Sequence, residues 1–211
     1  MDVKAQRNYF HSLYQIAAEV NSTRTRNGVL CSVAEMTAKG MRAKGCSLML
    51  LTPDGKQLIH TSAYGLSNQY VRKGPILTDK SIAQAVEGQP VAVLNATEDE
   101  RVQFREQARQ EGIVSILSVP MMLKETIIGV MRIYTAEPRE FTEDDLYFVC
   151  AAANLGAIAL ENTRLYQVCH KSKEEFRHEL LEWRAALGYD WMFDEPQEPS
   201  PERFPPGLAG A

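Results

Sequence analysis

The chain has 211 residues, of which 45% are hydrophobic and 24% are charged, and this length favours one globular domain with extensions. Its formal net charge is −4, so it lacks the excess of Lys and Arg that nucleic-acid binding requires. Residues 1–20 carry charged and amide side chains where a signal peptide needs an apolar run, and the longest apolar run, residues 150–160, is far too short to span a bilayer. We therefore expect a cytoplasmic protein that binds neither nucleic acid nor membranes.

The first third of the chain predicts two helices followed by a hairpin. Apolar residues recur at helical spacing within residues 8–23 and again within residues 28–41. In residues 45–65, two runs of β-favouring residues flank Pro53-Asp54-Gly55, a sequence suited to a tight turn. We expect two antiparallel strands there.

The middle of the chain alternates short predicted elements. Residues 78–90 predict a short helix with Thr78 or Asp79 at its start, and residues 91–95 predict a short strand. Residues 97–112 predict a second helix, because Thr97 and Glu100 have the spacing of a capping box.

The last third predicts a second hairpin and a long helix. Residues 113–135 contain two apolar runs that turn near Lys124, and residues 141–166 have a helical period that begins with Thr142 and Asp145 as N-terminal capping residues. Strands joined in hairpins, with helices between them, predict an antiparallel sheet in an α+β domain.

Several of these segments carry a resemblance to a known family. The stretch "GIVSILSVPMMLKETIIGV" is followed by "FTEDDLYF" and by "ENTRLY", and the earlier stretches "CSLMLLTPDGKQL" and "SIAQAVEGQPVAV" precede them in the matching order. Together, residues 10–168 resemble a GAF domain, here as a stand-alone protein of bacterial signalling type.

The resemblance implies a GAF (PAS-like) fold, which is α+β. Its central six-stranded antiparallel sheet has the first, second and last helices on one face, and the middle helices and loops enclose a small-molecule pocket on the other. Most members are sensory modules rather than enzymes. The Asn-Lys-x-Phe signature of the cyclic-nucleotide binders does not occur in this sequence, and Cys169-His170, which resembles a bilin-attaching pair, follows the last helix of the domain. The sequence therefore identifies no cofactor.

Strand alternation selects candidate ligand-binding residues. Alternate residues of a strand share a face, so Val130, Arg132 and Tyr134 lie together, opposite Met131 and Ile133. By analogy with the family, the first face lines the pocket. The candidate ligand-binding residues are Arg132, Tyr134, Ser118, Ser47 and Met49, with Tyr64 and Phe104 at the rim.

Arg132 is the unusual member of this set, because a guanidinium inside an apolar strand requires a partner. One interpretation is that it binds the carboxylate or phosphate of an anionic small-molecule ligand. The alternatives are an internal carboxylate or a side chain that reaches solvent. The sequence leaves these alternatives open.

Catalysis is the less favoured interpretation. Free methionine sulfoxide reductases share this fold and use a nucleophilic cysteine, a chemistry that needs an accessible thiol of low pKa with a partner thiol. Cys46 would be the nucleophile and Cys31 a weak partner. The four histidines have no spacing typical of metal ligands. We expect no catalytic residues and no metal.

The chain therefore divides into a GAF domain over residues 1–168, an amphipathic helical extension over residues 169–190, and an acidic, Pro-rich tail over residues 191–211 that we expect to be disordered. We expect a sensor that binds a small molecule, forms a homodimer through its terminal helices, and signals to a separate protein partner through residues 173–193. The alternative is a dimerisation or interaction module without a ligand.

Overall fold

The computed structural model describes residues 3–21, 26–81 and 83–186. The chain forms two compact units, residues 1–165 and residues 166–211. None of the described helices combines the length and the hydropathy that a membrane span requires. The tail expected at residues 191–211 lies outside the described residues.

The first unit is built on one sheet of six antiparallel strands in the order β3-β2-β1-β6-β5-β4. The strands are β1 Gly45–Leu51, β2 Gln57–Tyr64, β3 Ile76–Leu77, β4 Val91–Val93, β5 Ser115–Leu123 and β6 Thr126–Thr135. Both predicted hairpins are present, β1 with β2 and β5 with β6. Gly55 and Lys124 make the turns with φ values of 71° and 58°. The expected six-stranded α+β sheet is confirmed.

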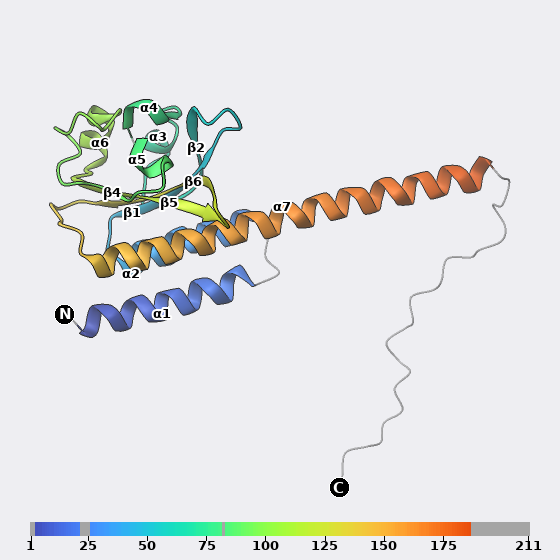
Figure 1. The fold of residues 1–211 in the computed structure, drawn as a ribbon, viewed down its shortest axis with the longest axis horizontal. Helices are drawn as coiled ribbons and strands as arrows, with labels where there is room; N and C mark the ends of the chain where they lie inside the picture. Colours follow the sequence, from blue (N-terminus) through green and yellow to red (C-terminus); the bar gives the residue numbers. More distant parts are fainter. Residues whose placement is uncertain (1–2, 22–25, 82, 187–211) are drawn as a thin grey trace, which may run out of the picture. The chain divides into compact units, whose positions relative to one another are not determined.

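Helices cover both faces of this sheet (Figure 1). On one face lie α1 (Val3–Val20), α2 (Arg26–Gly40) and the part of α7 (Glu143–Ala186) that belongs to the first unit. On the other face lie four short helices: α3 (Asn68–Val71), α4 (Thr78–Ser81), α5 (Ala83–Val86) and α6 (Arg105–Glu111). The arrangement of layers expected from the family resemblance is therefore confirmed.

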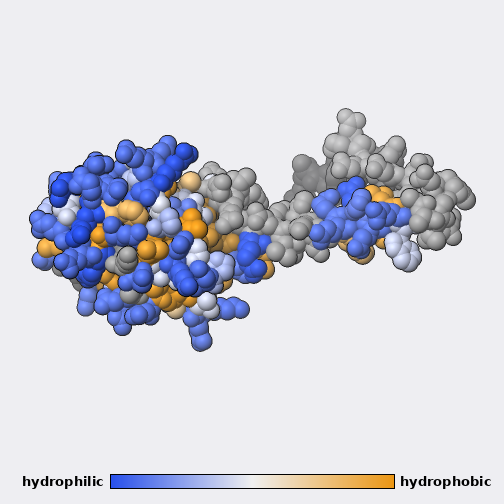
Figure 2. Space-filling view, turned by 90° about the horizontal axis from the view of Figure 1, so that it is seen from above, coloured by the Kyte–Doolittle hydropathy of each residue, from blue (hydrophilic) through white to orange (hydrophobic). Residues whose placement is uncertain are grey.

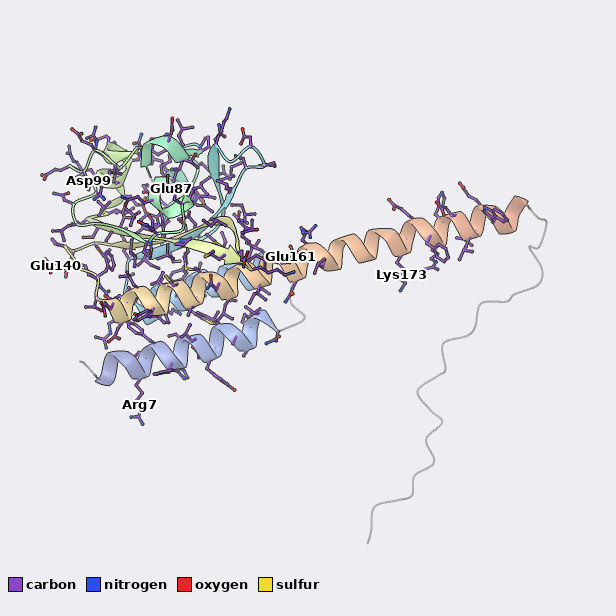
Figure 3. The ribbon with its side chains drawn as sticks, viewed as in Figure 1. Arg7, Glu87, Asp99, Glu140, Glu161 and Lys173 are labelled. Carbon is purple, nitrogen blue, oxygen red and sulfur yellow. The ribbon has the colours of Figure 1, made fainter. Side chains whose placement is uncertain are left out.

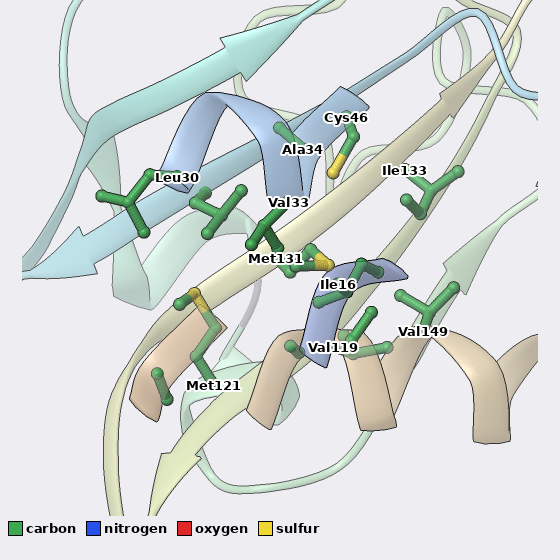
Figure 4. Packing of buried hydrophobic residues seen from close by; sticks show 14 of the residues in the cluster. Ile16, Leu30, Val33, Ala34, Cys46, Val119, Met121, Met131, Ile133 and Val149 are labelled. Carbon is green, nitrogen blue, oxygen red and sulfur yellow. The ribbon is translucent and has the colours of Figure 1, made fainter. Parts of the chain in front are cut away.

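The larger hydrophobic cluster fills the space between the sheet and α1, α2 and α7 (Figure 4). Alternate strand residues point into it, and each of the three helices contributes side chains. Among its members are Ile16, Val33, Cys46, Met131, Ile133 and Val149. Met131 and Ile133 thus lie on the helical face, as the alternation predicts.

Two smaller hydrophobic clusters lie under α3 to α6. One contains Tyr70, Val93, Ile116 and Tyr134, and the other contains Met49, Leu58, Ile76 and Val130. Val130 and Tyr134 therefore share the face predicted for the pocket, and the apolar lining of this face is divided into two parts.

The start of α7 agrees with prediction and the segment before α6 does not. The backbone N–H of Thr142 donates to Asp145 Oδ2 at 3.0 Å, and the N–H of Asp145 donates to Thr142 Oγ1 at 3.2 Å, which is a reciprocal capping box. The helix predicted over residues 97–112 is wrong in its first half, because α6 begins only at Arg105. Asn95 Oδ1 accepts hydrogen bonds from the N–H and the hydroxyl of Thr97, so this segment forms a turn instead. The sequence patterns also missed α3 and β3, which have four and two residues.

The second unit contains the continuation of α7 from Tyr166 to Ala186. The side chains described between residues 173 and 183 are exposed. Lys173 points away from the helix into solvent, as Arg7 does on α1 (Figure 3). The large apolar side chains of this unit that lie in solvent are Phe176, Leu180, Leu181 and Trp183.

The close approach of β6 to β1 predicts the effect of a single methyl group. A Cβ at Gly129 would lie 2.1 Å from the carbonyl oxygen of Met49, so we expect Gly129→Ala to lower the free energy of unfolding by about 3 kcal/mol. At Gly55 a Cβ meets no atom within 4 Å, although φ is 71°, and Gly55→Ala should cost only about 1 kcal/mol. Urea unfolding of both variants measures the difference. Equal losses would contradict the packing argument.

Candidate ligand-binding site

A row of paired residues crosses five strands under α3 to α6. The register places Ala63, Ser47, Arg132, Ser118 and Val91 side by side, from β2 through β1, β6 and β5 to β4. Paired residues of antiparallel strands point to the same face. Arg132 therefore lies in the middle of the face, between two serines whose small side chains leave room for a guanidinium.

Arg132 is buried, with 4% of its surface exposed. Its Nε donates a hydrogen bond to Ser118 Oγ at 3.0 Å. The alternative that the Arg132 side chain reaches solvent is therefore excluded. The guanidinium and the serines form a polar band between the two apolar clusters of this face.

Tyr134 borders the same band. Its hydroxyl lies 2.9 Å from Ser47 Oγ, and its ring meets that of Tyr70 edge to face with 5.7 Å between centroids. Burial raises the pKa of Tyr134, although the charge of Arg132 acts in the opposite direction. The hydroxyl is therefore neutral and can both donate and accept hydrogen bonds.

Lys73, which the sequence patterns did not single out, reaches this region from the loop after α3. Its Nζ donates to the carbonyl oxygen of Tyr70 at 2.9 Å and lies 3.2 Å from His60 Nε2. The ammonium also lies 3.6 Å from the ring centroid of Tyr70 and 5.5 Å from that of Phe104. Burial, helped by the charge of Arg132, lowers the pKa of Lys73 to about 7.

His60 of β2 is the neighbour of Lys73. Burial lowers the pKa of His60 to about 3, and the charges of Lys73 and Arg132 act in the same direction, so the ring is neutral near pH 7. A charged lysine can only donate, which makes Nε2 the acceptor and places the ring proton on Nδ1. His60 Nδ1 is buried and has no hydrogen-bond partner. It is a buried donor in need of an acceptor.

Negative charge is scarce around Lys73. Among the described residues, no carboxylate lies within ion-pair distance of its Nζ. Glu111 of α6 raises the Lys73 pKa through its charge, but this effect is the smallest of the three causes. The carboxylate of Glu111 accepts hydrogen bonds from the N–H of Ser67, at 2.8 Å, and from the Ser67 hydroxyl.

A surface hollow of about 520 Å³ lies between α3 and α6, next to Lys73. Two cationic and three amide side chains line it, and no carboxylate does: Asn68, Gln69, Arg72, Lys73 and Gln107. The face of the protein that carries α3 to α6 is mostly hydrophilic, with hydrophobic side chains visible between the polar ones (Figure 2). The hollow gives a solute access to Lys73 from solvent.

Six of the seven predicted site residues lie on this face. Arg132, Ser47 and Ser118 lie in the central row, Tyr134 and Met49 border it, and Phe104 packs against the cluster that contains Met49. Tyr64 does not. It pairs with Cys46, packs against the cluster on the helical face, and has Lys39 Nζ 5.9 Å from its ring centroid. The placement of Tyr64 at the pocket rim is therefore wrong, because Ala63 takes the position that faces the site.

A β-bulge explains why His60 was missed. The register of β1 with β2 shifts between Leu48 and Met49, so Ser62 pairs with Leu48 while His60 pairs with Met49. Ser62 therefore faces α2, where its hydroxyl donates to Cys31 Sγ at 3.3 Å, and His60 faces the site. Strict alternation along β2 would put both residues on one face.

The described cysteines do not form a reactive pair on the site face. Cys46 is buried in the helical-face cluster, and burial raises the pKa of its thiol. Cys31 is exposed on α2. The described residues also contain no group of three His, Cys, Asp or Glu side chains that could hold a metal ion.

Lys73 predicts a pH dependence of stability. The pKa of lysine is about 10.4 in an unfolded chain and about 7 in the folded protein, so between these values the unfolded chain binds more protons. The wild type should therefore become more stable as pH rises from 7 to about 10. We expect Lys73→Met to be about 2 to 4 kcal/mol more stable than the wild type at pH 7, and the advantage to shrink by pH 9. Urea unfolding at both pH values tests this, with the exposed Lys56→Met as control. A variant less stable than the wild type at pH 7 would contradict it.

Comparisons with known proteins place the chain in a family. The GAF domain family model matches residues 28–162, and no curated protein matches the chain. Among solved structures, the GAF domain of a phosphoenolpyruvate-protein phosphotransferase from Coxiella burnetii is similar, with a TM-score of 0.68 and 19% identity, covering 77% of this chain and 98% of that one.

Two further solved structures are similar. The free methionine-R-sulfoxide reductase from Neisseria meningitidis, in complex with its substrate, has a TM-score of 0.64 and 17% identity, covering 79% of this chain and 95% of that one. The blue-light absorbing form of the PixJ GAF domain from Thermosynechococcus elongatus has a TM-score of 0.55 and 15% identity, covering 72% and 94%. At such identities the likeness shows the fold alone. Because the family model matches more than half of the residues, the chain belongs to the GAF domain family.

Proposed function

We propose that this protein is a sensory GAF module that holds a small molecule on the Arg132 face and signals to a separate partner through its terminal helices. GAF domains are commonly sensing and signalling modules. The observation that carries the proposal is Arg132 itself, buried between Ser47 and Ser118 on a face that also carries two apolar clusters. An apolar site with a few convergent polar groups is the usual form of a small-molecule site.

The neighbouring groups support a ligand more than a purely structural role. Burial of the Lys73 ammonium lowers the stability of the folded protein, because a pKa of about 7 means that the charged form is disfavoured there. His60 Nδ1 has no partner. A domain that needed only packing would be more stable with apolar side chains at these positions. A bound molecule with acceptor groups would offset both costs.

We propose a binding role rather than catalysis. The similar reductase from Neisseria meningitidis is an enzyme, and thiol chemistry on this fold requires an accessible thiolate. Cys46 is fully buried with a raised pKa. The exposed thiol of Cys31 lies on α2, on the opposite side of the sheet from Arg132.

We propose that two copies of the chain associate through α1 and α7. Phe10 and Tyr147 have 75% and 72% of their surface exposed, and both line a groove of about 480 Å³ with Tyr9, Leu13 and Phe148. Large exposed apolar side chains that gather in one place typically mark an interface. The same groove favours the alternative function, a dimerisation module whose pocket holds no ligand.

The continuation of α7 supplies the proposed contact with a protein partner. Phe176, Leu180 and Trp183 have spacings of four and three residues and are exposed, which is the seam of an amphipathic helix. Residues 187–193 of the predicted partner segment lie outside the described residues. A ligand transmits a signal only if its affinity differs between two states of the module.

The ligand site predicts a charge-dependent stabilisation. In a thermal-shift screen of small metabolites, a compound at 100 times its Kd should stabilise the wild type by about 2.7 kcal/mol. Arg132→Met removes the charge but keeps an unbranched side chain, so we expect most of this stabilisation to disappear. Arg109→Met, which changes an exposed arginine of α6, should respond as the wild type does. A screen in which nothing stabilises the wild type would favour the module without a ligand.

The proposed dimer interface predicts that charged substitutions in the groove lower the molecular mass of the protein in solution. We expect the wild type to be a dimer by size-exclusion chromatography with light scattering, and the double variant Phe10→Glu, Tyr147→Glu to be a monomer, because two buried carboxylates cannot pair in that groove. Leu94→Glu changes another exposed apolar side chain, which is 53% exposed and does not line this groove, and should remain a dimer. A double variant that is still dimeric would exclude this groove as the interface.

A further inference from the structure

We propose that the ligand is a small oxyanion, a molecule that presents a carboxylate, phosphate or sulfate group, and that it binds in the hollow between α3 and α6 against Lys73. This inference rests on the proposed ligand-binding function and names the chemical class. It depends on residues that the sequence patterns did not select, namely Lys73, His60 and the amide side chains of the hollow.

Lys73 connects the hollow with the polar band below it. Its side chain lines the hollow together with Asn68, Gln69 and Gln107. Its Nζ reaches inward to His60 Nε2 and to the carbonyl oxygen of Tyr70. A group that enters the hollow from solvent therefore meets the Lys73 side chain.

The charge of this region selects the ligand class. Arg72 and Lys73 line the hollow without a carboxylate, and the charge of Arg132 acts on Lys73 from below. A cation would be repelled from Arg72 and Lys73, and a neutral molecule would offer these two side chains no opposite charge. An oxyanion would form charge-assisted hydrogen bonds with Lys73 and accept from the amide N–H groups of the hollow.

Lys73 itself gives a second reason for an acceptor-rich ligand. A charged ammonium has three hydrogens, so one remains to donate beyond those directed at Tyr70 and His60. Carboxylate, phosphate and sulfate oxygens each carry several lone pairs and donate nothing when ionised. The cluster therefore lacks what an oxyanion supplies.

Binding of such a ligand is linked to a proton. The groups that face Lys73 are His60 from β2, Arg132 from β6, Tyr70 from α3 and Glu111 from α6, with Arg72 beside it in the hollow. Near pH 7 His60 is neutral, because its pKa is about 3, and an arginine keeps its charge throughout this range. An anion raises the pKa of Lys73 from about 7, so Lys73 takes up a proton on binding. The affinity should then fall by about tenfold for each pH unit above 7, the limit for one proton.

Calorimetric titration of the full chain with sodium sulfate tests the proposal. Sulfate remains a dianion across the whole range, so any pH dependence belongs to the protein. Ionic strength is held constant with sodium chloride from pH 6 to pH 9, and two buffers of different ionisation enthalpy report proton uptake. We expect saturable binding at pH 6, uptake approaching one proton at pH 8, and a loss of affinity of about tenfold per unit above pH 7. Formate, a planar carboxylate, should show the same slope.

Lys73→Met provides the decisive comparison. It should fold, since it removes a buried cation, and circular dichroism checks this. At pH 6 we expect it to bind sulfate at least about tenfold more weakly than the wild type, about 1.4 kcal/mol. Lys56→Met, an exposed lysine in the β1–β2 turn, should bind as the wild type does. Equal affinity of Lys73→Met and wild type, or wild-type binding without proton uptake, overturns the proposal.

A parallel panel of neutral compounds separates this inference from the proposed function. A neutral compound that stabilises the wild type, and whose effect disappears in Arg132→Met, would overturn the oxyanion while the sensory function stands. If neither sulfate, formate nor any neutral compound binds the wild type, both proposals fail.

Discussion

The structure depends on how a charged side chain is held in the middle of a sheet. β6 is an interior strand with β1 and β5 on either side, so the sheet offers Arg132 no free edge from which to reach water. Ser47 and Ser118 pair with it on the two sides, and their short side chains leave the volume that the guanidinium fills. Larger neighbours in this row would have to move apart, because the packing of an interior face tolerates little extra volume.

The two faces of the sheet differ in how their side chains pack. The face under α1, α2 and α7 has a continuous apolar cluster, which supplies most of the hydrophobic stabilisation. The face under α3 to α6 is divided by the polar band into two small clusters. Two groups on this second face lower the stability of the fold: the buried ammonium of Lys73, and His60 Nδ1, which is buried without a hydrogen bond. Such departures from the rules of a stable core are expected where a protein binds rather than merely folds.

The sequence correctly predicted the features that depend only on neighbouring residues. The alternation of β6, the capping box of Thr142 and Asp145 and the turn at Gly55 each depend on a few adjacent residues. The predictions failed where the position of a residue depends on contacts with residues far away in the sequence. The bulge opposite Met49 turns His60 toward the site, and no pattern along β2 reveals it. Lys73 lies in a loop without a period, and its importance comes from Tyr70, His60 and Arg132, which approach it only in the folded chain.

The separation of the faces also constrains how a bound molecule could act. α3 and α6 lie across the sheet from α1 and α7 (Figure 1), so an effect at the hollow has to pass through strands to reach the terminal helices. β6 is suited to this, because Arg132 faces the site while Met131 and Ile133, its neighbours in the chain, pack in the helical-face cluster. A shift of Arg132 toward an anion would move the backbone that positions both side chains. Close-packed interiors respond to such shifts by repacking rather than by gradual deformation. The close contact of Gly129 with Met49 ties β6 to β1, so the two strands would move together and carry that change to α2 and α7.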